Sequence, residues 1–155
     1  ARPEDSQLIS GAIDLLNANR TDWTRFWRQL AKLRSVPVDL AEDAPVRDLV
    51  IDRAAFDAWA AQYRQRLAAE GSDDAARAVR MNRINPKFVL RNHLAETAIR
   101  KARGEDGPRD FDEVARLMHI LERPYDEQPG REAFAQRRPD WARDRAGCSM
   151  LSCSS

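Results

Sequence analysis

The feature that most constrains the fold is the spacing of the large apolar residues, which return every three or four positions along much of the chain. In the range 21–33 these residues are Trp23, Phe26, Trp27, Leu30 and Leu33. In the range 52–70 they are Phe56, Trp59, Ala60, Tyr63 and Leu67. Residues at this spacing share one face of an α-helix. We therefore expect two helices whose aromatic faces are buried.

Weaker patterns predict further helices on either side. Residues 7–16 have helical apolar spacing, residues 74–80 suit a short charged helix, and residues 46–51 allow a turn of helix inside a Pro-rich loop. Thr21 is the expected N-cap of the helix that follows it, because a hydroxyl there can accept a free backbone amide. Gly71 stands where a left-handed C-terminal cap is expected.

Two more helices are predicted in the second half of the chain. Asn85 and Pro86 have the chemistry of a helix start, which predicts a helix over residues 86–103. Residues 110–113 resemble a capping box, with Asp110 in place of the usual Ser or Thr, and they predict another helix that Pro124 stops. The expected apolar stripe of this last helix is Val114, Leu117, Met118 and Leu121.

The chain as a whole is predicted to be all-α. No alternating run of β-branched residues is long enough to indicate a sheet, and no repeat period is present. The expected architecture is an irregular bundle of about five or six helices over residues 1–123. Prolines, glycines and arginines dilute the apolar residues after that, so residues 124–155 are expected to form an extended tail that ends in Cys-Ser-Ser.

Charge and cysteine content exclude several classes of protein. The 26 basic and 25 acidic residues nearly cancel, so we expect no nucleic-acid partner. No apolar run approaches the roughly 20 residues of a membrane span, so no membrane partner is expected either. Two cysteines close to the C-terminus are too few for a secreted disulfide framework. A bacterial-type cytoplasmic location is therefore expected.

The residue types that carry chemistry are poorly placed for an active site. The six glycines are scattered and form no phosphate-binding loop. His93 and His119 have no zinc-ligand spacing, and a surface or partly buried helical position is expected for both. The acidic pairs at 73–74 and 112–113 stand at predicted helix starts, where the helix dipole favours negative charge. We therefore predict no catalytic, cofactor-binding or metal-binding residue in this chain.

The terminal thiol is the one candidate functional group. Cys153 is the third residue from the C-terminal end of the expected tail, where a thiol can be accessible to solvent and can reach distant partners. It is a candidate redox group. A free surface thiol without consequence and a local disulfide between Cys148 and Cys153 remain alternatives that the sequence does not separate.

Several segments together resemble the selenoprotein O family. The segment 85–92, NPKFVLRN, is similar to the NPKYVLRN-type motif of that family. Three further segments follow the order of the family's pattern. They are TDWTRFWRQL at 21–30, the stretch 111–129 from FDEV to LERPYDEQP, and SCSS at 152–155.

The resemblance implies that the chain is the helical C-terminal portion of a larger kinase-like protein adenylyltransferase. Such a pseudokinase transfers AMP from ATP to Ser, Thr or Tyr hydroxyls of proteins with the help of Mg²⁺ or Mn²⁺. The family's nucleotide- and metal-binding residues lie in a region that would precede Ala1. This implies that the chain alone is inactive, and that its partners are the missing kinase-like domain and the protein substrates of the parent enzyme.

The resemblance also strengthens the redox expectation for Cys153. The family carries selenocysteine or cysteine at the third position from the end, and in bacterial relatives this residue is thought to pair with a cysteine of the activation loop. Cys148 is not part of that pattern, so its competition for Cys153 stays open. The alternative reading of the whole chain is a free-standing helical module that binds another protein through exposed apolar stripes.

Overall fold

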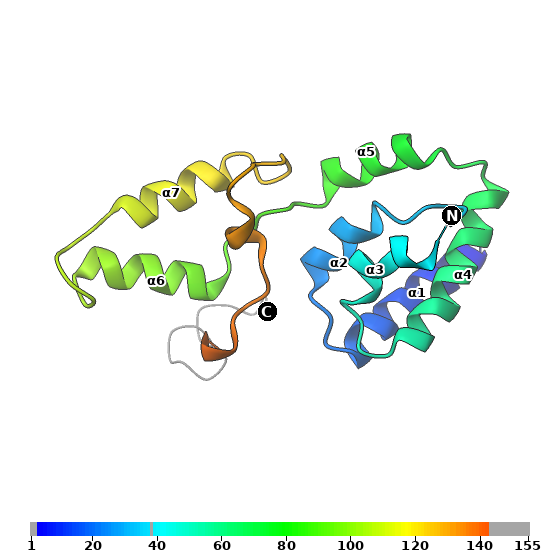
Figure 1. Cartoon of the computed structure of the whole chain (residues 1–155), viewed down its shortest axis with the longest axis horizontal. Helices are drawn as coiled ribbons and strands as arrows, with labels where there is room; N and C mark the ends of the chain where they lie inside the picture. The colour runs from blue at the N-terminus through cyan, green and yellow to red at the C-terminus, as the bar shows by residue number, and fades with distance from the viewer. Residues whose placement is uncertain (1–2, 38, 143–155) are drawn as a thin grey trace. The chain divides into compact units, whose positions relative to one another are not determined.

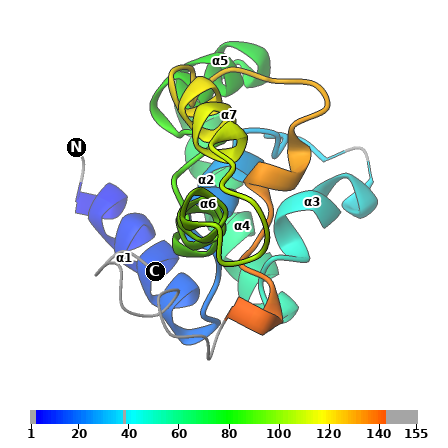
Figure 2. The same ribbon diagram turned by 90° about the vertical axis from the view of Figure 1, so that its left-hand side faces the viewer.

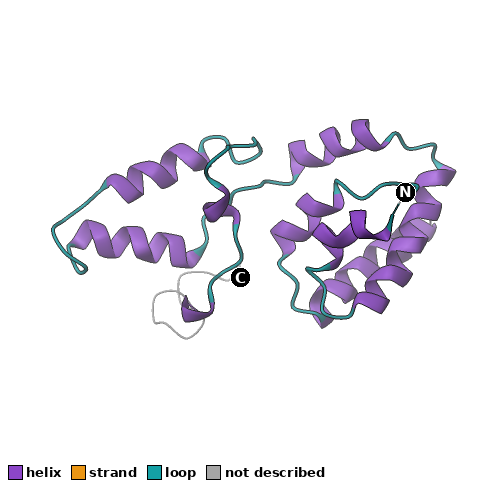
Figure 3. Cartoon of the chain, in the orientation of Figure 1, coloured by secondary structure: helices purple, strands orange, loops and turns teal. Residues whose placement is uncertain are grey.

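The computed structural model describes residues 3–37 and 39–142, and these residues are mainly helical (Figures 1 and 3). The elements are α1 (Pro3–Ala18), α2 (Trp23–Leu30), η1 (Leu40–Asp43), α3 (Ala44–Arg47), α4 (Arg53–Ala69), α5 (Asp74–Ile84), α6 (Asn92–Arg103), α7 (Asp112–Leu121), η2 (Glu132–Ala135) and η3 (Asp140–Ala142). No strand occurs in the described ranges. The predicted all-α class is confirmed. The turn of helix expected over residues 46–51 is displaced toward the N-terminus, because α3 ends at Arg47.

The chain divides into two compact units, Ala1–Asn85 and Pro86–Ser155. The first unit holds α1 to α5, and the second holds α6, α7 and the two 3-10 helices η2 and η3. This division falls inside the range 1–123 that the sequence predicts to be helical. The predicted start of a separate tail at residue 124 remains a prediction.

The first unit is built around an aromatic core. Helix α1 packs along α4, and α2 contacts both α3 and α5 (Figures 1 and 2). Phe26 is fully buried, and its ring centroid lies 5.9 Å from that of Trp59 and 6.5 Å from that of Phe56. Edge-to-face and tilted rings at these separations add to the stabilisation that burial gives. The buried core is Ala12, Leu15, Leu16, Phe26, Leu30, Leu33, Val46, Val50, Phe56, Trp59 and Ala60.

Aspartates begin three helices of the first unit. Asp22, Asp52 and Asp73 each accept a hydrogen bond from the backbone N–H three residues later, at 3.1, 2.9 and 2.7 Å. The prediction that Thr21 caps α2 is therefore wrong by one residue, because the carboxylate of the next residue makes the bond. The prediction for Gly71 is confirmed, since its φ of +63° is left-handed.

The second unit is built on the pair α6 and α7, which pack against each other (Figure 1). Gly104 ends α6 in the left-handed region with φ of +75°, and a Cβ there would lie 3.0 Å from the carbonyl oxygen of Gly107. A glycine is therefore required at this turn. The buried apolar residues of the described part of this unit are Phe88, Ala98, Leu117, Ile120 and Ala142.

The predicted start of α6 is wrong by six residues. Asn85 ends α5 instead of capping α6, because its backbone N–H and its Nδ2 both donate to the carbonyl of Met81, at 2.9 and 3.0 Å. Proline is allowed both at the first helical position and shortly after a helix end, so the local pattern fits both readings. Residues 86–91 are non-helical, and α6 begins at Asn92.

Three local predictions for the helix ends and faces are corrected. Trp23 is 53% exposed although it belongs to the aromatic stripe of α2, because it is the first residue of that helix and lies beyond the core. Met118 is 63% exposed, and Ile120 is buried in its place. Asp110 accepts the N–H of Asp112 at 2.8 Å, so it makes a local turn and not the predicted capping box.

Candidate functional site

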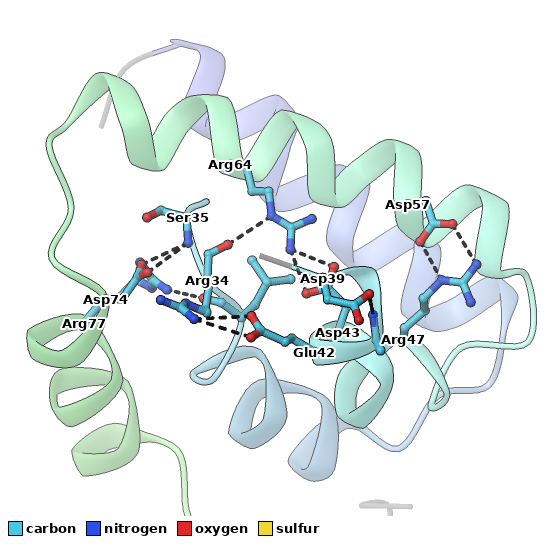
Figure 4. A network of polar contacts seen from close by, with 12 residues as sticks. Arg34, Ser35, Asp39, Glu42, Asp43, Arg47, Asp57, Arg64, Asp74 and Arg77 are labelled. Carbon is cyan, nitrogen blue, oxygen red and sulfur yellow. Dashed lines mark hydrogen bonds and ion pairs between the residues drawn. The ribbon is translucent and has the colours of Figure 1, made fainter. Parts of the chain in front are cut away.

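Side chains of α5 hold the loop that leaves α2. Asp74 accepts the backbone N–H of Ser35 at 3.0 Å and pairs with Arg77 at 2.6 Å (Figure 4). Arg77 is buried and also donates to the carbonyl of Leu33. Burial raises the pKa of Asp74, but the hydrogen bonds from Arg77 and Ser35 outweigh it and hold that pKa below its ordinary value. The carboxylate therefore stays charged and keeps the loop in place.

A buried ion pair between α4 and the last residue of η1 continues the network. Nη2 of Arg64 lies 2.7 Å from both carboxylate oxygens of Asp43, whose side chain is only 4% exposed. Nε of Arg64 donates to the carbonyl of Arg34 at 3.0 Å (Figure 4). One guanidinium thus ties the loop that leaves α2 to the start of α3. Desolvated pairs of this kind depend on having both partners present.

The remaining members of the network are more exposed. Arg47 pairs with Asp57 through two hydrogen bonds of 2.7 and 2.8 Å, and these bonds lower the pKa of Asp57. Arg34 pairs with Glu42 at 3.4 Å. Figure 4 shows four carboxylates that each pair with an arginine, and these are Glu42, Asp43, Asp57 and Asp74. The arrangement therefore suits a fixed loop better than acid–base catalysis.

In the second unit, two of the motif segments meet. The backbone N–H groups of Lys87 and Phe88 both donate to the carbonyl of Pro124, at 2.8 and 3.1 Å. Nζ of Lys87 lies 2.6 Å from Oε2 of Glu127, and the Phe88 side chain is 1% exposed. The segments NPKFVLRN and LERPYDEQP are therefore joined, which the sequence analysis did not predict. Nothing in local sequence indicates which distant carbonyl an amide will reach.

A buried glutamine closes the turn after α7. Nε2 of Gln128 donates to the carbonyls of Ile120 and Arg123, at 3.0 and 2.9 Å, and the residue is 7% exposed. These carbonyls lie at the last turn of α7 and just after it, and they also accept the backbone N–H groups of Arg123 and Asp126, at 3.4 and 3.2 Å. The side chain thus fixes where the chain goes after the helix.

In the acidic pair at the start of α7, Glu113 is held between two cationic side chains. Glu113 is 9% exposed, and its Oε2 lies 2.9 Å from Nη1 of Arg116 and 3.3 Å from Nζ of Lys101. Lys101 belongs to α6, so the carboxylate links the two helices.

The two histidines differ in their surroundings. His93 is 8% exposed, which corrects the expected surface or partly buried position, whereas the side chain of His119 is 53% exposed, as expected. The His93 ring is perpendicular to that of Trp141, with centroids 6.3 Å apart. Burial, followed by the charges of Arg91 and Arg138, lowers the pKa of His93, so its ring is neutral near pH 7. Aromatic contact with a neutral ring is the role its geometry supports.

The redox role of Cys153 stays a prediction. Cys148 and Cys153 both lie outside the described residues. Among residues 3–37 and 39–142, no group of three His, Cys, Asp or Glu side chains is placed to hold a metal ion. Within the same ranges, no helix is long and apolar enough to cross a membrane.

The relatives of this chain are protein nucleotidyltransferases. It is 55% identical to the protein nucleotidyltransferase YdiU of Cupriavidus pinatubonensis over 152 residues, which cover 98% of this chain and 27% of the relative. It is 53% identical to the YdiU proteins of Burkholderia ambifaria and Burkholderia vietnamiensis over 154 residues, or 99% of this chain and 28% of each relative. The chain thus spans little more than a quarter of the length of these relatives.

The family follows from a second comparison. Residues 1–120 match the family described as protein adenylyltransferase SelO. The chain belongs to the SelO family, which confirms the resemblance carried by the motif segments.

Proposed function

We propose that this chain is the helical accessory portion of a protein adenylyltransferase, which transfers AMP from ATP to Ser, Thr or Tyr hydroxyls of proteins. The observation that carries the proposal is the coverage: nearly the whole chain matches nucleotidyltransferase relatives, but it spans only 27% of the length of the first of them. Adenylyl transfer requires cationic groups and metal ions that neutralise the charge of the phosphates. We assign those groups, together with Mg²⁺ or Mn²⁺, to the remaining three quarters of such a protein.

The charge arrangement supports an accessory role for the described residues. Asp74, Asp43 and Glu113 are the most enclosed carboxylates described above, and each already pairs with arginine or lysine. A carboxylate that binds Mg²⁺ must exchange such a partner for the metal. We therefore route no step of the transfer through these side chains.

Exposed apolar side chains on the second unit support a packing role. Only five apolar residues of its described part are buried, whereas five large ones are at least 45% exposed. The exposed residues are Leu90, Phe111, Met118, Tyr125 and Trp141. Small units that bury little apolar area depend on a further surface for stability. We propose that the rest of the adenylyltransferase polypeptide supplies that surface.

The regulatory part of the proposal concerns Cys153. A reversible disulfide between Cys153 and a cysteine elsewhere in the full-length protein would restrain the catalytic portion under oxidising conditions. The resemblance to the family and the position of the thiol near the chain end support this role. The proposal fails if Cys153→Ser leaves the ratio of activities in oxidised and reduced buffer unchanged.

Intact mass spectrometry tests the proposed function. Candidate protein substrates are incubated with ATP and either Mg²⁺ or Mn²⁺, and this chain is compared with a polypeptide that also carries the remaining length of its relatives. We expect AMP to be added only by the longer polypeptide. Addition of AMP by the short chain would show that the catalytic groups are in residues 1–155.

The same experiment addresses the free-standing interaction module as the second candidate. The first unit favours it, because it has an eleven-residue apolar core of its own and also exposes large apolar side chains such as Ile51 and Ile84. If neither polypeptide adds AMP and the short chain alone binds a separate protein, the interaction module is the correct reading.

A further inference from the structure

We propose that the turn between α1 and α2 carries a docking patch, made of Arg20, Trp23 and Ile51, for a segment of the remaining polypeptide. The occupant is a stretch of that polypeptide that presents a carboxylate beside an apolar side chain. The inference rests on the proposed function only in taking the remaining polypeptide to be an adenylyltransferase, since the patch itself consists of described residues. It gives a role to Arg20, which takes no part in the aromatic core.

Three helices, α1, α4 and α6, end in the same type of turn, in which backbone N–H groups bond back across a left-handed residue. After α1, the N–H of Arg20 donates to the carbonyl of Asn17 at 3.2 Å, and the N–H of the next residue donates to that of Leu16 at 3.0 Å. The left-handed residue is Gly71 after α4 and Gly104 after α6, but after α1 it is Arg20, with φ of +48°. Glycine avoids the strain that a side chain meets at such a φ. The arginine therefore lowers the stability of the chain at this position.

No contact of the Arg20 side chain within the described residues offsets this cost. Arg20 is exposed, and among residues 3–37 and 39–142 its side chain makes no hydrogen bond or ion pair. Strained residues cluster at functional sites such as ligand contacts. We therefore place the partner of this guanidinium outside the described residues.

Two exposed apolar side chains flank the same turn. Trp23 is 53% exposed, and its ring meets that of Trp27 edge to face with centroids 5.4 Å apart, which fixes its orientation. Oδ1 of Asn19 accepts the N–H of Asp52 at 2.7 Å, and this bond brings the 83% exposed Ile51 to the turn. The turn after α1 and the start of α4 lie at one end of the first unit (Figure 1). An arginine beside a fixed tryptophan is typical of the residues that dominate protein interfaces.

The size of the patch favours an occupant in the same polypeptide. Three side chains expose far less than the roughly 800 Å² per partner that a stable interface between separate proteins buries. A segment of the same polypeptide needs less area, because its effective concentration reaches the millimolar range. The match covers only 27% of the first relative, so most of such a polypeptide can supply the segment. Arg20 pairs best with a carboxylate, and the two apolar side chains with an apolar neighbour, which defines the chemistry of the occupant.

Urea unfolding of the 155-residue chain tests the strain at Arg20. Arg20→Gly should raise the midpoint by about 0.5 M, because relief of the strained φ outweighs the extra entropy of an unfolded glycine. Arg20→Gln should leave the midpoint unchanged, because it removes the charge and keeps the strain. A midpoint that Arg20→Gly does not raise would overturn the argument that the arginine serves a partner at the expense of stability.

Hydroxyl-radical footprinting read by peptide mass spectrometry tests the docking. The rate of oxidation at Trp23 is measured in the 155-residue chain and in a polypeptide of the full length of the relatives. We expect oxidation to be several-fold slower in the longer polypeptide, and Arg20→Gln to return it toward the rate of the short chain. Arg83→Gln is the matched control, because Arg83 is also exposed but lies on α5, and it should leave Trp23 protected. Protection that Arg20→Gln leaves unchanged would overturn the role of Arg20.

The outcomes separate this inference from the proposed function. Equal oxidation of Trp23 in the two polypeptides would overturn the docking patch even if the longer one adds AMP. Protection that appears only after a separate protein is added would also overturn it, because that result fits the free-standing interaction module. If the longer polypeptide adds no AMP but protects Trp23 in a way that depends on Arg20, the proposed function fails and the docking patch stands.

Discussion

Replacing Arg64 by methionine should destabilise the first unit far more than replacing Arg47, although both arginines pair with an aspartate at 2.7 Å. The difference is burial. The side chains of Arg64 and Asp43 are 15% and 4% exposed, whereas those of Arg47 and Asp57 are 33% and 48% exposed. Water therefore screens the second pair and hardly reaches the first.

The magnitudes follow from what each variant leaves behind. Arg64→Met leaves the charge of Asp43 buried without its partner, which costs about 3–5 kcal/mol. Arg47→Met breaks an exposed pair, which costs about 0.2–1 kcal/mol. The double variant Arg64→Met with Asp43→Leu removes both charges, so only the hydrogen bond to the carbonyl of Arg34 is lost. We expect a net cost of about 1 kcal/mol for that double variant.

Urea unfolding followed by tryptophan fluorescence checks these values. A Trp141→Phe background leaves the three tryptophans of the first unit as the only reporters. With a slope of about 2 kcal/mol per molar urea, Arg64→Met should lower the midpoint by about 2 M. If Arg64→Met costs no more than Arg47→Met, or if the double variant is less stable than Arg64→Met alone, the argument from the buried charge is refuted.

Three further predictions concern the turns, the second unit and pH. Gly104→Ala should destabilise the chain more than Gly71→Ala. Alanine in the positive φ of either glycine costs about 1–2 kcal/mol, but only at Gly104 would the added Cβ also meet another backbone atom. Equal urea midpoints for the two variants would contradict this. Phe88→Ala should lower the stability by about 3–5 kcal/mol and Phe111→Ala hardly at all, because Phe88 is 1% exposed and Phe111 is 63% exposed. Similar losses of stability for the two variants in calorimetry would refute this. Because the folded-state pKa of His93 is lowered, the unfolded chain binds its proton first, so stability should fall as pH drops below about 6.5. His93→Gln should flatten that part of the profile, and an unchanged profile would show that another group is responsible.

The helical faces could be read from the sequence because their physics is local. Phe26, Phe56, Trp59 and Leu67 stand at helical spacing, and all four are buried as expected. The ends of those stripes were less predictable. Trp23 fits the same period but is half exposed, since periodicity identifies a face without showing how far along the helix the core extends.

The contacts between distant segments could not be predicted in the same way. The start of α6 depends on the carbonyl of Pro124, which draws Lys87 and Phe88 into an extended segment. Local residue preferences at Asn85 and Pro86 allowed both a helix end and a helix start. Arg64 and Asp43 lie 21 positions apart, and the sequence contains many other arginines and aspartates that could form such a pair equally well.

The hydrogen bonds from Lys87 and Phe88 to Pro124 join the two ends of the segment 87–124, so this segment forms a closed backbone loop. The N–H groups that precede α6 bind the carbonyl that follows α7, so the outer ends of the two helices cannot separate without breaking these bonds. Such a segment should open and close as one cooperative unit, with hydrogen-exchange rates that change together across α6 and α7. The pair of helices α6 and α7 could then change during evolution as one piece, independently of the aromatic core of the first unit.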